Sequence, residues 1–86
     1  MYKRQLSGHI VYPDFVIRHP KTGQIYYWEH CGKMDDMDYV KRLCTKLEEY
    51  AKHGIVPSIN LILTYETGEN PLDPEMVEKI IQYYFT

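Results

Sequence analysis

The stretch YPDFVIRHPKTGQIYYWEH, residues 12–30, decides the fold because it places two strand-forming runs on either side of a turn. The first run, Ile10 to Arg18, and the second, Gln24 to His30, are rich in β-branched and aromatic residues. Pro20 and Gly23 lie between them, and both residue types are typical of tight turns. The stretch therefore predicts an antiparallel β-hairpin.

The register of this hairpin brings two acids together. If residues 20–23 form a four-residue turn, Asp14 on the first strand lies directly opposite Glu29 on the second. Like charges in directly opposed positions destabilise a strand pair, so a neutralising partner is expected. A divalent cation such as Mg²⁺, which one or two carboxylates commonly hold, is one partner, and a solvated acid pair without function is the alternative. The other positions on this face favour the cation, because unpaired acids are costly among apolar neighbours such as Tyr12, Val16, Ile25 and Tyr27.

A helix follows the hairpin. Asp35 and Asp36 are candidate N-cap residues, and His53 with Gly54 reads as a C-terminal stop, so the helix spans about 17 residues. The helical spacing predicts a buried stripe centred on Met37, Val40, Cys44, Leu47 and Ala51.

The rest of the chain predicts one more strand and one more helix. SINLILTY, residues 58–65, is the nearly continuous apolar run of a strand buried on both faces. Asp73 and Pro74 then begin a helix whose apolar stripe contains Met76, Val77, Ile80, Ile81, Tyr84 and Phe85. The fold class is α/β or mixed α+β in the order β-β-α-β-α. The second strand, first helix and third strand should form a right-handed parallel crossover.

Composition limits the function classes. The chain has 86 residues, which allow one domain at most, and its formal net charge of −2 gives no overall basic footprint for nucleic acid. A polyanion site would therefore be a local patch. No apolar run approaches the ~20 residues that span a bilayer, and Cys31 and Cys44 fit a reducing, cytoplasmic setting rather than a disulfide framework.

The first five residues, MYKRQ, look like the translation of a transposase adapter used in sequencing libraries. On that interpretation residues 1–5 are a scar that is excluded from fold analysis. Residues 6–86 are then the C-terminal part of one domain, and upstream domains of the same chain are missing. The alternative is a genuine N-terminus that begins this way by chance.

YPDFVI followed by IYYWEHCG resembles the PD-(D/E)xK nuclease superfamily, which has a restriction-endonuclease-like fold, over roughly residues 10–85. The resemblance implies that Asp14, Glu29 and the backbone carbonyl of His30 bind Mg²⁺ or Mn²⁺. It also implies a lysine that positions the water attacking a phosphodiester. The full-length protein is then expected to hydrolyse nucleic acid, with DNA the expected substrate, although the sequence alone leaves DNA and RNA both open.

Two departures from the family pattern stand out. Cys31 occupies the position of the lysine, and the family's first helix, which often brings another acidic ligand, is absent. KLEEY, however, places Lys46 and Tyr50 at the spacing of the Gln-x-x-x-Tyr motif of RecB-like members. The resemblance therefore implies that Lys46 replaces the missing lysine from the helix, with Tyr50 beside it at the edge of the core. The alternative is an ordinary surface lysine next to a packed tyrosine.

Other residues suggest weaker interpretations. The His30 side chain should point away from the acids, as a core or supporting group. A zinc site from His30, Cys31 and Cys44 matches no known spacing. Four basic residues are interpreted as part of the solvent-exposed face of the helix, namely Lys33, Lys41, Arg42 and Lys52. The alternative is that they contact the phosphate backbone of a nucleic acid. Two functions remain open, a metal-dependent nuclease module and a degenerate, inactive copy of the fold that binds nucleic acid or protein.

Overall fold

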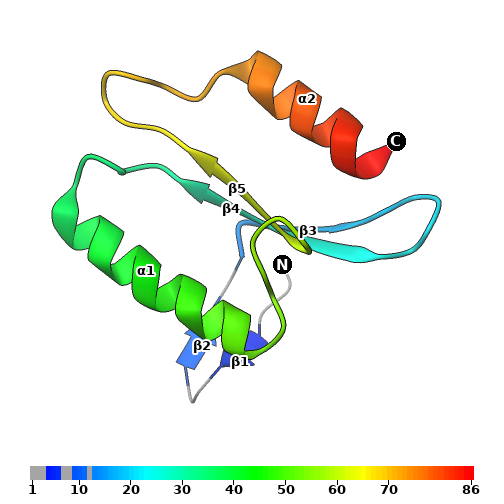
Figure 1. Ribbon diagram of the computed structural model, residues 1–86, viewed down its shortest axis with the longest axis horizontal. Helices are drawn as coiled ribbons and strands as arrows, with labels where there is room; N and C mark the ends of the chain where they lie inside the picture. Colours follow the sequence, from blue (N-terminus) through cyan, green and yellow to red (C-terminus); the bar gives the residue numbers. More distant parts are fainter. Residues whose placement is uncertain (1–3, 7–8, 12) are drawn as a thin grey trace.

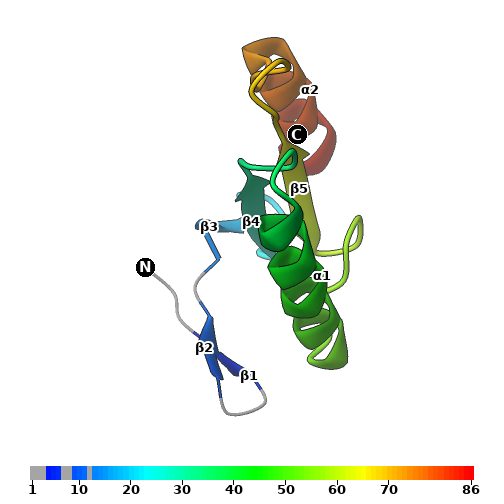
Figure 2. The ribbon, with the colours of Figure 1, turned by 90° about the vertical axis from the view of Figure 1, so that its left-hand side faces the viewer.

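A computed structural model describes residues 4–6, 9–11 and 13–86. Two helices cover the two faces of a three-stranded sheet with the strand order β3-β4-β5 (Figure 1). A separate antiparallel pair, β1 with β2, projects away from this sheet (Figure 2). In chain order the elements are β1 Arg4–Leu6, β2 His9–Val11, β3 Phe15–Arg18, β4 Ile25–Cys31, α1 Met37–Lys52, β5 Leu61–Tyr65 and α2 Pro74–Phe85. The mixed α/β class and the order β-β-α-β-α of residues 13–86 are as predicted.

The β3–β4 hairpin has the predicted register. Phe15 pairs with Trp28, and Arg18 pairs with Ile25 at the turn. The His19 N–H donates to the Gln24 carbonyl at 2.8 Å and closes the loop. Gly23 has a φ of 76°, a left-handed conformation that glycine adopts without steric cost.

The first predicted strand, residues 10–18, is split in two. β2 ends at Val11 and β3 begins at Phe15, while Tyr12 lies outside the described residues. Pro13 explains the interruption, because its ring fixes φ and it has no N–H to donate to a neighbouring strand. The break falls immediately before Asp14.

The crossover from β4 through α1 to β5 is parallel, as predicted, with Tyr27 beside Leu61 and Cys31 beside Tyr65. The Asp36 carboxylate caps α1 by accepting from the backbone N–H of Asp38 and Tyr39. β5 is shorter than the predicted strand because residues 58–60 form a turn. No helix in the described part of the chain is long and apolar enough to cross a membrane.

Successive residues of β4 face opposite helices. Tyr27 packs with Tyr50, Ile55 and Leu61 on the α1 side of the sheet, where the main core lies. On the other side the Tyr26 ring meets the rings of Tyr84 and Phe85 of α2 edge-on, with centroids 5.5 Å and 5.2 Å away. α2 begins at the predicted N-cap, Asp73, but none of its residues is fully buried.

The predicted buried stripe of α1 is wrong in part, because Leu47 packs against the core but three other members do not. Met37 is 68% exposed, and Cys44 and Ala51 are also exposed, whereas Leu43 and Tyr50 are buried. At about 100° per residue, Leu43, Leu47 and Tyr50 define a stripe rotated by roughly 70° from the predicted centre. The larger side chains of this stripe bury more apolar area than cysteine or alanine does. Tyr50 therefore lies in the core rather than at its border.

Candidate active site

Glu29 is the centre of a buried polar cluster between β4 and α1. Its carboxylate accepts a hydrogen bond from the Tyr50 hydroxyl at Oε1, 2.9 Å away, and forms an ion pair with Lys46 Nζ at Oε2, 3.0 Å away. The Glu29 side chain is 6% exposed and that of Lys46 is 32% exposed. Because Lys46 and Tyr50 are one helical turn apart, α1 presents both donors to the same acid. The structure thus brings together three of the predicted catalytic residues.

The surroundings of Glu29 keep its neighbours protonated. Burial raises the pKa of the Tyr50 hydroxyl, and the charge of Glu29 and the hydrogen bond to it raise this pKa further. Burial also raises the pKa of the Cys31 thiol, followed by the charge of Glu29. Tyr50 is therefore a neutral donor at physiological pH. Cys31 is a neutral thiol rather than a thiolate ligand.

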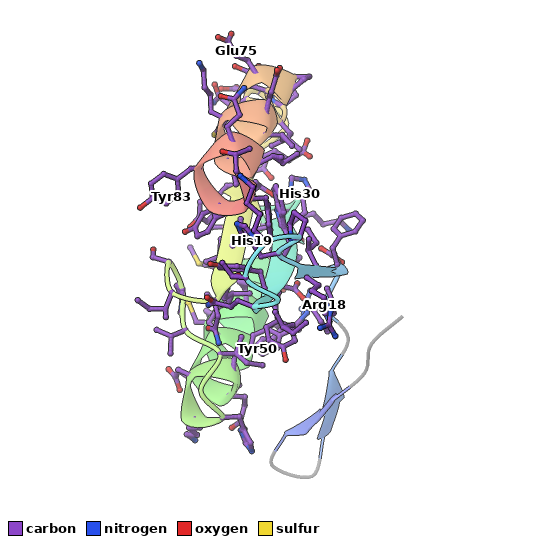
Figure 3. All side chains as sticks on the ribbon, turned by 90° about the vertical axis from the view of Figure 1, so that its right-hand side faces the viewer. Arg18, His19, His30, Tyr50, Glu75 and Tyr83 are labelled. Atoms are coloured by element: carbon purple, nitrogen blue, oxygen red, sulfur yellow. The ribbon has the colours of Figure 1, made fainter. Side chains whose placement is uncertain are left out.

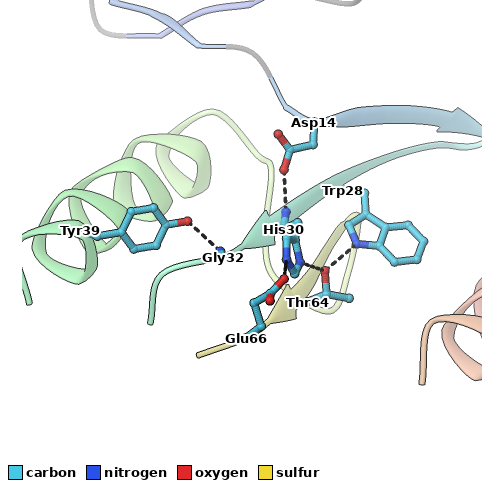
Figure 4. Close-up of polar contacts among 7 residues, drawn as sticks. All are labelled: Asp14, Trp28, His30, Gly32, Tyr39, Thr64 and Glu66. Carbon is cyan, nitrogen blue, oxygen red and sulfur yellow. Dashed lines mark hydrogen bonds and ion pairs between the residues drawn. The ribbon is translucent and has the colours of Figure 1, made fainter. Parts of the chain in front are cut away.

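Asp14 reaches the same region from the strand opposite. Its Oδ2 accepts the backbone N–H of His30 at 2.7 Å (Figure 4). Its charge also contributes, as the smallest cause, to the raised pKa values of Cys31 and Tyr50. The paired residues of the hairpin end at Phe15 and Trp28, and Asp14 lies one residue before β3. The same register continued by one position would place Asp14 opposite Glu29.

Pro13 explains why Asp14 bonds to the backbone. The N–H of Tyr27 donates to the Asn60 carbonyl just before β5, and the carbonyl of Cys31 accepts from Glu66 just after it, so the odd-numbered residues of β4 bond toward the β5 side. The N–H and carbonyl of His30 consequently face the β3 side of the sheet. The register continued two positions beyond Phe15 would set Pro13 opposite His30. Pro13 has no N–H for the His30 carbonyl. A ladder continued to this position would therefore leave the His30 carbonyl without a backbone donor, at the same edge where Asp14 accepts the His30 N–H.

The donor set suits a hard divalent cation. Asp14, Glu29 and the carbonyl of His30 offer oxygen atoms only, as Mg²⁺ prefers, and Mg²⁺ usually keeps several waters. Within residues 13–86 no group of three or more His, Cys, Asp or Glu side chains is arranged to hold a metal ion. A cation here would therefore depend on two carboxylates, the backbone carbonyl and water.

The His30 side chain lies on the other face of the sheet, as predicted. Its Nδ1 is 2.8 Å from Thr64 Oγ1 and its Nε2 is 2.5 Å from Glu66 Oε1 (Figure 4). Trp28 Nε1 donates to the same Thr64 oxygen at 3.2 Å. Figure 3 shows His30 toward α2 and Tyr50 beside α1. The predicted alternation of the two faces is thereby confirmed.

The structure does not assemble the zinc alternative. His30 and Cys31 point to opposite faces of the sheet because they are consecutive in β4. Cys31 is fully buried, whereas Cys44 is exposed on α1. The three side chains therefore do not converge on one point.

A groove opens beside Glu29, and its other walls come from α1. It has a volume of about 200 Å³ and is lined by Glu29, Tyr39, Arg42, Leu43 and Lys46. Tyr39 was not predicted as a site residue, and Arg42 was assigned to the solvated face. The spacing of Tyr39, Arg42 and Lys46, which are three and four residues apart, is the signal that places them on one ridge.

No protein-family profile, curated protein or solved structure matches this chain. The assignment of the site therefore depends on the residues and their geometry.

Proposed function

We propose that this chain carries the active site of a PD-(D/E)xK-type nuclease module, which hydrolyses phosphodiester bonds of nucleic acid, with DNA the expected substrate. The observation that supports the proposal is the convergence of Lys46 and Tyr50 on Glu29, with Asp14 bonded to the backbone N–H of the adjacent residue His30. Lys46 supplies from α1 the ammonium that Cys31, at the family's lysine position, does not supply.

The residues have distinct roles in this proposal. Asp14, Glu29 and the carbonyl of His30 would hold Mg²⁺ or Mn²⁺, which when bound polarises a phosphate oxygen and acidifies a coordinated water. Lys46 stabilises negative charge that develops on the phosphate, because its ammonium is fixed before the reaction begins. Tyr50 holds one oxygen of Glu29 and so fixes the orientation of the carboxylate.

A degenerate copy of the fold is the second candidate. The ion pair between Lys46 and Glu29 already neutralises the buried carboxylate, so the cluster is electrostatically complete without a cation. A binding module would keep this arrangement for stability alone. A measurement of phosphodiester hydrolysis distinguishes the active nuclease module from the inactive copy of the fold.

The test uses the full product of the gene that encodes this chain. A labelled oligonucleotide, as single strand and as duplex, is incubated with the protein and Mg²⁺, with an EDTA control. We expect products with the wild type and none with Glu29→Gln or in EDTA. Glu75→Gln, at an exposed position of α2, makes the same change in charge as Glu29→Gln and serves as the control. It should give the same amount of product as the wild type. Absence of hydrolysis by a folded wild type would favour the degenerate copy.

A further inference from the structure

The groove beside Glu29 has a donor-rich wall that the catalytic roles do not use. Arg42 lies one turn before Lys46, and Tyr39 lies one turn before that, all on the side of α1 that lines the groove. Arg42 is exposed, so its guanidinium is hydrated and accessible to a ligand. Arginine suits phosphate because its planar fork donates two parallel hydrogen bonds.

Tyr39 lines the groove, and a backbone contact holds its phenol in place. Its hydroxyl oxygen accepts the backbone N–H of Gly32 at 3.2 Å, after the end of β4 (Figure 4). This contact fixes the phenol at the groove wall and leaves its own proton for another acceptor. A phosphate oxygen between Arg42 and Tyr39 would receive hydrogen bonds from both.

The spacing along α1 matches a nucleic-acid backbone. Residues four apart on a helix are about 6 Å apart along its axis, and successive phosphates of one strand rise by about 3.4 Å. A strand that presents one phosphate at Lys46 and Glu29 and runs toward the N-terminus of α1 therefore reaches Arg42 within one or two nucleotides.

We infer that Arg42, with Tyr39, forms a second phosphate-binding position, which holds the substrate strand one or two nucleotides from the bond that is cleaved. This inference rests on the proposed function for the identity of the cleaved bond. The binding of the phosphate itself depends only on the groove. Leu43 contributes an apolar side chain to the lining of this groove.

Oligonucleotide binding by the 86-residue chain, measured by fluorescence anisotropy in EDTA at several salt concentrations, tests the inference. Arg42→Gln should weaken binding on the order of tenfold, since a charge-assisted contact is lost. It should also make the slope of log affinity against log salt shallower by about 0.7 for a single strand or 0.9 for a duplex. Arg42→Lys, which keeps the charge, should retain most of the salt slope.

Lys41→Gln is the matched control, because Lys41 is adjacent in sequence, exposed and outside the groove. We expect it to change affinity less than twofold. Equal weakening by Lys41→Gln and Arg42→Gln, or no binding by a folded wild type, would overturn the inference. If binding depends on Arg42 but the gene product does not hydrolyse DNA, only the proposed function fails.

Discussion

Replacing Tyr50 with phenylalanine isolates one contact of the buried cluster. The ring of Tyr50 is fully buried in the core, and its hydroxyl donates to Glu29 at 2.9 Å. Tyr50→Phe keeps the ring and creates almost no cavity. It therefore removes one hydrogen bond to a buried, ionised acceptor and little else.

The expected loss of stability follows from that contact. Hydrogen bonds to charged groups contribute about 1.5–3 kcal/mol. Because Lys46 still neutralises Glu29 after the substitution, we expect a loss of about 2 kcal/mol in the free energy of unfolding. A protein of this length typically has about 4–13 kcal/mol, so the change is large enough to measure.

Urea unfolding followed by circular dichroism measures this loss. With a slope of about 1 kcal/mol per molar urea, the midpoint should fall by about 2 M. Tyr83→Phe is the control, because Tyr83 is 81% exposed on α2 and points away from the sheet (Figure 3). It should change stability by less than about 0.5 kcal/mol. If the two variants have the same midpoint, Tyr50 does not hold Glu29 as described.

Two further predictions concern alkaline pH and the proline before Asp14. The pKa of Tyr50 is raised above its unfolded value of about 10, so its contribution to stability is complete below pH 10 and declines above it. Above pH 10 the free energy of unfolding of the wild type should therefore fall more steeply with pH than that of Tyr50→Phe, by up to about 1.4 kcal/mol per pH unit. Parallel curves of unfolding free energy against pH for the two proteins would refute the raised pKa. Pro13→Ala supplies an N–H to the His30 carbonyl and should weaken Mn²⁺ binding, measured by titration calorimetry, roughly tenfold. Pro20→Ala, in the exposed turn, should leave this affinity unchanged, and equal affinities for the two variants would contradict the role of the carbonyl.

The hairpin register could be predicted because it depends on local chemistry. The turn at Pro20 to Gly23 leaves one register that keeps the aromatic residues of both strands on matching faces. Two acids at facing positions then follow without any tertiary information. The four-residue spacing of Lys46 and Tyr50 predicted that one side of the helix presents two hydrogen-bond donors, and in the structure both donate to Glu29.

The rotation of α1 could not be predicted from its apolar pattern. That pattern counts Met37, Cys44 and Ala51 as core residues and cannot reveal that Tyr50 has a buried hydrogen-bond partner on another strand. Once Glu29 accepts the hydroxyl, the whole tyrosine can be buried without an unpaired polar atom.

The network on the far side of the sheet was missed for a similar reason. His30 contacts Thr64 and Glu66, which lie more than 30 residues further along the chain. Only the parallel pairing of β4 with β5 brings these side chains together. No local motif in the sequence carries that information.

Titration of the 86-residue chain with Mn²⁺, followed by electron paramagnetic resonance of the free ion, tests the central claim most directly. We expect one bound ion per chain in the wild type. Asp14→Asn and Glu29→Gln should each weaken binding by at least about tenfold, since each removes a charged oxygen ligand. Asp14 is exposed, so its variant should fold even if Glu29→Gln does not. Wild-type affinity in a folded Asp14→Asn protein, or no Mn²⁺ binding by the wild type, would contradict the claim that these two acids form a metal site.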